Sequence, residues 1–386
     1  MVQTIFPRFS DKEYARRRKA VTEMMKKQRV EGLLVFAGPL KEGRIFYLAN
    51  YVPQLPTWFI YPLDGEPTLL LHMYNHIQNA MKMSITRDIR WYGPDAVETI
   101  ARVFGEKKLQ ESRVGVVGLA DIVPYDAFVR LKSALPRAIF QDVTRPYDAI
   151  REIKSEEEIE WHRRSAHLTD LAMEALGREI RPGLTRYDLS SIVHSAFVPK
   201  GGHMGIHYIS STSMDSPSVT VPWQFLTPEV ISKGDVVITE ITIKYWTYES
   251  QLHRPFGVAR EPTQLYQGLF DVALECYERV AKAIRPGSTT EDVLNASSII
   301  EERGFRIGDS LVHGCEAGKH PELGTRNSVY PPEPYTFKEN TVVIIQPLPV
   351  DPVTGAGLQL GSATLVTQSG AKSIHDYPMR FTVCRA

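Results

Sequence analysis

The sequence predicts an α/β N-terminal domain over residues 1–152, followed by an α+β C-terminal domain over residues 153–386 that is built from two related halves. Two observations lead to this fold class. Strand and helix patterns alternate through the first domain, which is typical of an α/β layer structure with a largely buried sheet. In the second domain, a short motif and the elements around it occur twice. The length of 386 residues fits two or three domains.

The first domain begins with a charged segment in which Tyr14, Val21 and Met24 recur at helical spacing. Short apolar runs punctuated by Gly and Pro follow, together with segments of helical pattern. In chain order we expect a helix at 12–28, a buried strand at 32–36, apolar runs at 45–48, 58–61 and 68–71, a helix at 97–104, a strand at 114–117 and a helix at 124–135. The segment 117–120 could suggest a nucleotide loop. Neither G-x-G-x-x-G nor a Walker lysine accompanies it, so we do not predict nucleotide binding.

The boundary between the domains is expected near residue 152, where a long charged helix begins. Ser155 and Glu158 have the S-x-x-E spacing of a capping box, in which each residue hydrogen-bonds the other's backbone. The helix is therefore expected to start at residue 156 and to continue to residue 177.

The second domain contains an internal repeat. The sequence Ile-Arg-Pro-Gly occurs at 180–183 and again 104 positions later. In each copy a helix precedes this motif, and an apolar-periodic segment and a strand follow it. The helices are expected at 156–177 and 265–283, the periodic segments end at residues 193 and 300, and the strands are expected at 234–240 and 339–346. The offset is too long for a solenoid, whose repeats run from about 20 to 50 residues. It indicates a duplicated half with Glu240 and Gln346 at related strand ends. A site between these two residues is one interpretation, and equivalent strand ends without chemistry are the other.

Composition excludes several classes of protein. Lys+Arg and Asp+Glu both number 45, so no basic surplus exists to bind a nucleic-acid backbone. Apolar runs such as 341–345 are far shorter than the roughly 20 residues that span a bilayer. Residues 1–20 are charged from Arg8 onward, so we expect no secretory signal and a cytoplasmic protein. The three cysteines are too few and too widely spaced for a disulfide framework or a cysteine metal site.

Several motifs, taken in order, resemble the creatinase/prolidase/aminopeptidase P family, whose C-terminal domain has the pita-bread fold. They are Phe46–Asn50, the hinge Arg151–Glu158, Arg181–Gly183, Gly234-Asp235, His313-Gly314, and Leu365–Thr367 with Gly370. The resemblance covers nearly the whole chain. It implies a homodimer in which the N-terminal domain of one subunit covers the active site of the other. The segment 51–59 with Trp58 is a candidate for that covering loop, and aromatic residues of the domain's own core are the alternative.

The metal-dependent members of this family hold two divalent ions with two Asp, one His and two Glu. Hard cations prefer carboxylates, and a water between two ions becomes a nucleophile near neutral pH. The resemblance places these five positions on Glu240, Gln251, His313, Gln346 and Gly361. Neutral amides and a glycine cannot balance two dications, so we expect neither a dinuclear metal centre nor another cofactor. A single ion on Glu240 and His313 is left open.

Creatinase belongs to the same family and uses no metal. Creatinase instead uses an active-site His together with carboxylates that bind the guanidinium of its substrate. In this chain Trp223 occupies the position of that His, while His253 and Gln346 occupy the positions of the carboxylates. Neither creatine nor its mechanism is therefore expected here.

The candidate catalytic residues are His320, His313 and Glu240. His320 falls on the family's second active-site His, seven residues after His313, and is predicted to be the acid/base because a His titrates near neutral pH. His313 and Glu240 are predicted to orient the substrate. For each of the three, a structural hydrogen bond or ion pair is the alternative.

A second group of residues is predicted to bind the substrate. Arg254 suits a substrate carboxylate in bidentate geometry, or could pair with Glu240 if that carboxylate is buried. Gln251, Gln346 and His253 are neutral hydrogen-bonding groups at site positions. The remaining candidates are His207, Trp223 and Trp58. Core packing is the more frequent role of such aromatic residues.

The first functional hypothesis is a metal-independent enzyme that hydrolyses a C–N bond of a small molecule by His acid/base chemistry. A lyase on the same scaffold, a non-catalytic pseudo-peptidase that binds a ligand, and a metal-dependent Xaa-Pro peptidase are the alternatives. The expected partners are a small-molecule substrate and a second copy of the chain, with no nucleic acid and no membrane.

Overall fold

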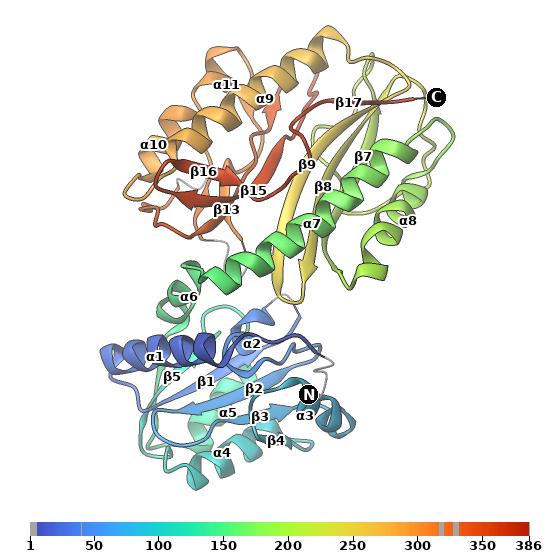
Figure 1. Cartoon of the computed structure of the whole chain (residues 1–386). Coiled ribbons are helices and arrows are strands. Elements are labelled where there is room, and N and C mark those ends of the chain that lie inside the picture. Colours follow the sequence, from blue (N-terminus) through green and yellow to red (C-terminus); the bar gives the residue numbers. More distant parts are fainter. Residues whose placement is uncertain (1–5, 40, 316–319, 327–331, 386) are drawn as a thin grey trace. The chain divides into compact units, whose positions relative to one another are not determined.

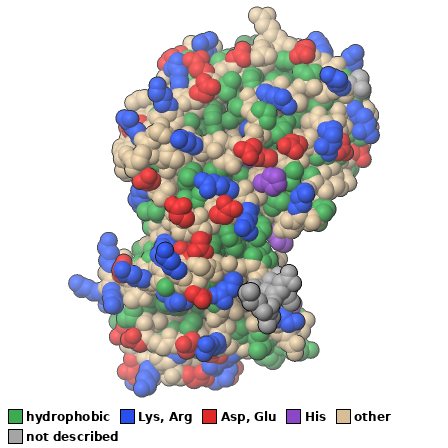
Figure 2. All heavy atoms as spheres, viewed as in Figure 1, with side chains coloured by type: hydrophobic (Ala, Val, Ile, Leu, Met, Phe, Trp, Pro, Cys, Tyr) green, Lys and Arg blue, Asp and Glu red, His purple; other side chains and the backbone are tan. Residues whose placement is uncertain are grey.

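The computed structural model of the chain describes residues 6–39, 41–315, 320–326 and 332–385. The chain divides into two compact units, Met1–Glu152 and Ile153–Ala386, and each is described by itself (Figure 1). Among the described residues, no helix is long and apolar enough to cross a membrane. Acidic and basic side chains are interspersed over the face shown in Figure 2.

Within its described residues, the first unit contains a six-stranded mixed sheet in the order β4-β3-β2-β1-β5-β6. Strand β2 runs antiparallel to β1 and β3, and the other neighbours are parallel. The elements are α1 (Asp11–Gln28), β1 (Gly32–Ala37), α2 (Gly43–Ala49), β2 (Thr57–Pro62), β3 (Thr68–Leu71), η1 (Tyr74–His76), α3 (Ile77–Met83), β4 (Asp88–Trp91), α4 (Ala96–Glu106), β5 (Arg113–Val117), α5 (Tyr125–Ala134), β6 (Ile139–Asp142) and α6 (Thr144–Glu152).

The central strand β1 of this sheet is buried on both faces. Leu33 and Val35 of β1 pack in one apolar cluster with residues of α1 and α2. Leu34 and Phe36 pack in a second cluster with residues of α4 and α5. A strand that is buried on both faces has no polar alternation, which explains why its sequence is a continuous apolar run.

The three apolar runs of the first unit, whose element types the sequence left open, form one helix and two strands. The run at 45–48 lies in helix α2, and the runs at 58–61 and 68–71 are strands. The placement of Trp58 in a loop is wrong, because β2 begins at Thr57. Trp58 is 2% exposed, and its ring centroid lies 4.5 Å from that of Phe36 in the unit's own core. A side chain buried in this way offers no surface to a substrate.

The described part of the second unit contains a nine-stranded sheet. Its main path is β12-β11-β13-β15-β9-β8-β7, with β16 beside β15 and β17 beside β9. The elements are α7 (Glu156–Glu179), α8 (Arg186–Phe197), η2 (Val198–Lys200), β7 (His203–Ser213), β8 (Asp235–Tyr245), β9 (Tyr248–Val258), α9 (Gln264–Ala283), α10 (Thr290–Ala296), α11 (Ile299–Glu302), β10 (Arg306–Ile307), β11 (Val312–Gly314), β12 (Glu322–Leu323), β13 (Val342–Ile345), β14 (Pro349–Val350), β15 (Gly361–Thr367), β16 (Gly370–Ser373) and β17 (Thr382–Cys384).

The predicted helix starts agree with the structure. The Ser155–Glu158 capping box opens α7, with both of its reciprocal hydrogen bonds present. The internal repeat also appears in the residues that cap the N-termini of helices α8 and α10. Thr185 with Asp188 opens α8, and Thr289 with Asp292, at the same 104-position offset, opens α10. In the second copy the helical segment is divided into α10 and α11.

The two halves of the repeat meet where β9 pairs with β15. In this pairing Gly361 lies opposite His253, and Ser362 lies opposite Leu252. Helix α7 packs on one face of the sheet, where Ile241 belongs to the same apolar cluster as Leu168 and Met173 of that helix. Side chains that alternate with these along β8 and β9, Glu240 among them, are directed to the opposite face.

Candidate functional site

A cavity of about 560 Å³ lies on this opposite face of the second unit. Its walls come from β7, the segment 221–227, β8, β11, β12 and the residues next to β11 and β13. The described lining residues are Ile206, Tyr208, Val221, Pro222, Trp223, Gln224, Phe225, Thr227, Glu240, Asp309, Ser310, His313, Glu322 and Gln346. The volume lies in the range of ordinary small-molecule sites. Four predicted site residues therefore share one cavity: Trp223, Glu240, His313 and Gln346.

A chain of hydrogen bonds joins these residues at the base of the cavity. The Gln251 side-chain nitrogen donates to Oε1 of Glu240 at 3.1 Å and lies 3.3 Å from Oε1 of Gln346. The same Gln346 oxygen lies 3.1 Å from Nε2 of His313. Gln251 is held in this orientation because the Thr242 hydroxyl donates to its Oε1 at 3.0 Å. Glu240 and His313 are thus connected through two neutral amides.

The residues present do not fit a two-metal centre. The Gln251 nitrogen faces Glu240, Gln346 and Nε2 of His253, the last at 3.0 Å, so an N–H donor lies among three acceptors where the family places a metal ligand. A cation prefers oxygen lone pairs to the positive end of an N–H dipole. Among the described residues, no group of three or more His, Cys, Asp or Glu side chains is placed to hold a metal ion.

The fifth metal-ligand position of the family is Gly361, which cannot supply a ligand. Gly361 has no side chain, and a Cβ built on it would lie 2.8 Å from Nδ1 of His253 and 2.5 Å from the carbonyl oxygen of Ile345. No glutamate fits at this position while the His253 ring stays where it is. Burial, together with the neighbouring His313 and Arg254, holds the pKa of His253 well below its ordinary value, so the ring is neutral. The neutral imidazole of His253 thus fills the space into which a side chain at position 361 would extend.

His313 is placed between two oxygen atoms. Its Nδ1 lies 2.9 Å from the carbonyl oxygen of Gly314, and its Nε2 faces Oε1 of Gln346. Turning the Gln346 amide over would place its oxygen against the carbonyl oxygen of Ser310, to which the Gln346 nitrogen now donates at 3.2 Å. Both ring nitrogens of His313 therefore face acceptors, which a protonated imidazole satisfies with its two N–H groups.

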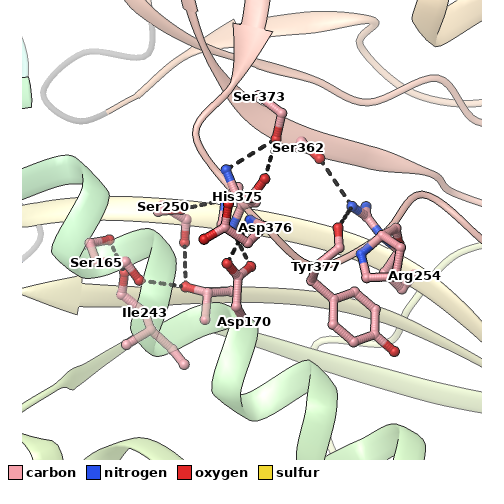
Figure 3. A network of polar contacts seen from close by, with 12 residues as sticks. Ser165, Asp170, Ile243, Ser250, Arg254, Ser362, Ser373, His375, Asp376 and Tyr377 are labelled. Atoms are coloured by element: carbon pink, nitrogen blue, oxygen red, sulfur yellow. Dashed lines mark hydrogen bonds and ion pairs between the residues drawn. The ribbon is translucent and has the colours of Figure 1, made fainter.

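The prediction that Arg254 binds substrate or pairs with Glu240 is wrong. The Arg254 side chain is 1% exposed and points to the other face of β9, because successive residues of a strand alternate. Its guanidinium bonds the hydroxyl of Ser362 and main-chain carbonyl oxygens, two of which belong to Tyr377 and Pro378 (Figure 3). Burial lowers its pKa to about 10, so it stays charged at neutral pH. Arg254 joins β9 to β15 and to the C-terminal segment.

His207 is directed away from the cavity as well. Its neighbours Ile206 and Tyr208 line the wall, whereas His207 lies beside His194 of helix α8, with ring centroids 5.3 Å apart. Burial and the neighbouring His194 lower the pKa of His207 to about 4. The prediction that His207 faces the cleft is therefore wrong.

His320 is not among the described residues that line the cavity. It follows the undescribed segment 316–319, and the next residue, Pro321, accepts a backbone hydrogen bond from Gly314 at 2.7 Å. Of the two histidines, the geometry favours His313 as the acid/base. His313 borders the cavity and is hydrogen-bonded to Gln346.

Trp223 lies on the cavity wall, and its binding role stays a prediction. The Arg186 guanidinium lies 4.7 Å from the centroid of its ring. Sequence reasoning missed Tyr208, Asp309 and Glu322. Tyr208 is opposite Glu240 in the β7–β8 register, so strand pairing could have found it. Glu322 is opposite His313 in the short pairing of β12 with β11, for which the sequence gives no comparable signal.

A second polar network resembles a Ser-His-Asp triad but is closed to substrate (Figure 3). His375 bonds Asp170 of α7 through Nδ1 at 2.8 Å and Ser250 of β9 through Nε2. Ser250 is fully buried, and Asp170 and His375 are nearly so. Asp170 also accepts from the backbone N–H of Asp376 at 2.8 Å. The network fastens the C-terminal segment to α7, and the burial of its three side chains keeps them from a substrate.

The comparisons with known proteins agree with this architecture. The model for metallopeptidase family M24 matches residues 160–368, which is more than half of the chain. The chain belongs to this family. The model for the creatinase/prolidase N-terminal domain matches residues 17–153. The predicted family and fold class, including the pita-bread C-terminal domain, are confirmed.

Individual relatives are distant. The chain is 22% identical to the Xaa-Pro dipeptidase of Pyrococcus horikoshii, over 92% of this chain and 95% of that one. It is 25% identical to the ectoine hydrolase of Halomonas elongata, over 70% of each. The solved structure of an Xaa-Pro dipeptidase from Bacillus anthracis superposes with a TM-score of 0.80 at 20% identity, over 96% of this chain and 99% of that one. Both named relatives are hydrolases.

Proposed function

We propose that this M24 family member is a metal-independent hydrolase that cleaves a C–N bond of a small molecule. The observation that carries the proposal is the Glu240–Gln251–Gln346–His313 chain, in which two neutral amides stand where metal ligands are expected. Of the five family positions, Glu240 keeps a carboxylate and His313 keeps an imidazole, and both border the cavity. These are the groups that general acid–base hydrolysis requires.

The proposed reaction uses Glu240 as base and His313 as acid. Glu240 takes a proton from a water molecule while the water oxygen bonds to the substrate carbon. The C–N bond then breaks, and His313 gives its proton to the leaving nitrogen. A proton passes back from Glu240 to His313 through the water of the cavity, and this restores both groups. Gln251 and Gln346 hold the pair in place by the hydrogen bonds described above.

The names of the relatives favour a second function, a metal-dependent Xaa-Pro dipeptidase. The ectoine hydrolase among them is a relative whose name gives a substrate other than an Xaa-Pro peptide. The residues at the family's metal-ligand positions, Gln251, Gln346 and Gly361, favour a metal-independent hydrolase over a metal-dependent dipeptidase. A small-molecule substrate, a homodimer and a cytoplasmic location stay predictions.

The test is turnover in ¹⁸O-labelled water. Chelator-treated protein is incubated with a panel of small amides, amidines, guanidino compounds and an Xaa-Pro dipeptide, and products are analysed by mass spectrometry. We expect turnover of a compound other than the dipeptide, with one labelled oxygen in the product. A product without label would indicate a lyase. Cleavage of the dipeptide alone, and only after manganese is added, would establish the metal-dependent peptidase.

A further inference from the structure

We propose that Arg186 is a positioning residue that holds Trp223 as a fixed wall of the cavity, and that an uncharged aromatic group of the substrate packs against the Trp223 ring. This inference rests on the proposed function, because it names a substrate class for the same cavity. It is carried by the place of Arg186 in the fold, by its contacts with the wall, and by the side chains that form the wall.

Arg186 is a cation in an unfavourable place. It is the first residue of helix α8, where the helix dipole disfavours positive charge, and it is 2% exposed. Burial lowers the pKa of its guanidinium, which still stays protonated at neutral pH. The Glu229 carboxylate pairs with it at 2.5 Å but is more than half exposed, so solvent weakens the attraction. Residues that break local rules in this way tend to lie at functional sites.

The contacts of Arg186 show what this charge holds in place. We call residues 220–229 the wall segment, and they contain neither helix nor strand. The Arg186 guanidinium lies over the Trp223 ring, 4.7 Å from its centroid, and donates to the Thr227 hydroxyl at 2.7 Å. It also donates to the carbonyl oxygen of Ser211 at 3.0 Å, so it fastens the wall segment to β7. Segments without regular structure are mobile unless such contacts hold them.

The orientation of the Trp223 ring depends on this contact more than on the backbone. The Trp223 N–H donates to the Ser210 hydroxyl, and the Thr220 hydroxyl donates to the carbonyl oxygen of Gly355 at 2.6 Å. These bonds fix the main chain of the wall segment but do not orient the indole. A guanidinium over the ring face does orient it, because the cation is attracted to the electron-rich face.

The wall that Arg186 supports is largely apolar and aromatic. The described lining residues from β7 and the wall segment are Ile206, Tyr208, Val221, Pro222, Trp223, Gln224, Phe225 and Thr227. Trp223 is 38% exposed and Phe225 is 81% exposed. A ligand ring that covers these side chains removes apolar surface from water, and a wall ring already held in place loses little entropy on binding. Tyr208 is paired with Glu240 across β7 and β8, so the wall adjoins the proposed base.

Charge limits the group that can pack on this wall. Because the Arg186 guanidinium already lies over the Trp223 ring, a second cation on that ring would be repelled. An anionic group would meet the carboxylates of Glu240, Asp309 and Glu322, which line the same cavity. An uncharged aromatic ring avoids both, and aromatic pairs gain stability beyond the area that they bury.

The experiment compares three probes by isothermal titration calorimetry on the full chain. Phenylacetamide carries an uncharged aromatic ring, cyclohexylacetamide carries a saturated ring, and 1-(carbamoylmethyl)pyridinium has the shape of phenylacetamide with a cationic ring. We expect phenylacetamide to bind about threefold to tenfold more tightly than cyclohexylacetamide. It should bind about tenfold more tightly than the pyridinium, since that ring is repelled by Arg186.

Variants assign the effect to the two residues. Trp223→Ala changes a partly exposed side chain and should reduce the affinity for phenylacetamide about tenfold. Arg186→Met should reduce it by about threefold to tenfold and bring the affinities for phenylacetamide and the pyridinium closer together. Arg186→Lys keeps the charge without the planar fork, so it should keep the discrimination against the pyridinium. Circular dichroism checks the folding of each variant.

A double-mutant cycle separates positioning from a purely structural role. If Arg186 acts through Trp223, Arg186→Met should cause no further loss of phenylacetamide affinity in a Trp223→Ala background. The matched control is Arg260→Met, which removes an exposed arginine of the same unit. Arg260 pairs with Asp215, outside the lining of the cavity, and its replacement should leave the binding of all three probes unchanged.

Unchanged phenylacetamide affinity in Trp223→Ala would overturn the inference, even if Arg186→Met failed to fold. So would equal losses from Arg186→Met with and without Trp223, or a pyridinium that binds as tightly as phenylacetamide. These results would leave the proposed function standing if turnover without metal were found in labelled water. Conversely, metal-dependent turnover would end the proposed function, while the three probes would still report which group packs on the wall.

Discussion

A Glu240→Gln variant is expected to fold normally and to lose turnover by a factor of about 10² to 10⁴, the usual contribution of a general base. The substitution keeps the shape of the side chain, and its amide oxygen can still accept the hydrogen bond from Gln251. What it removes is the ability to take a proton from water. The measurement is kcat on the compound found in the labelled-water panel, with Glu261→Gln, which removes an exposed carboxylate of the same unit outside the cavity, as the matched control.

The two roles proposed for the acid/base pair can be separated. His313→Asn should reduce kcat by a similar factor, and it should also change the alkaline limb of the pH–rate profile if His313 supplies the proton. His320→Asn should have a much smaller effect. Full activity of Glu240→Gln, or a larger loss in His320→Asn than in His313→Asn, would contradict the assignment.

An Arg254→Met variant is expected to lower the free energy of unfolding by about 3 to 5 kcal/mol. Methionine fills much of the same volume but donates no hydrogen bonds. Its introduction would leave the buried carbonyl oxygens of Gly361, Tyr377 and Pro378 without their donor. The change should appear as a lower urea midpoint.

Arg285→Met is the control for this stability prediction. Arg285 is exposed in the same unit, and its replacement should change stability by no more than about 0.5 kcal/mol. If Arg254 bound substrate, as the sequence suggested, Arg254→Met would instead keep the wild-type urea midpoint and raise KM. That result would overturn the structural role assigned here.

The sequence was informative where local rules apply. The capping box at Ser155 and the repeated caps at Thr185 and Thr289 follow from hydrogen bonding within a few residues. The internal repeat also indicated that Glu240 and Gln346 could share a site, because duplicated halves place equivalent strand ends together. Arg254 could have been excluded by strand alternation, since its neighbour His253 occupies a site position and successive residues face opposite sides.

Other features of the site could not be predicted from local sequence patterns, because they depend on strand register and on contacts between distant segments. The face of His207 could not be read by alternation along β7, because the register shifts between Met204 and His207. Asp309 and Glu322 enter the cavity from short segments around β11. Trp58 lies in a run that is buried on both faces, and such a run gives no sign of whether it continues as a strand or becomes a loop.

The absence of a metal requirement is the central claim, and elemental analysis tests it most directly. The protein is produced in medium supplemented with manganese, cobalt and zinc, and is then purified without chelator. We expect well under one ion per chain, and turnover that is unchanged when a chelator is added. About two ions per chain, with turnover lost to the chelator and restored by manganese, would contradict the account.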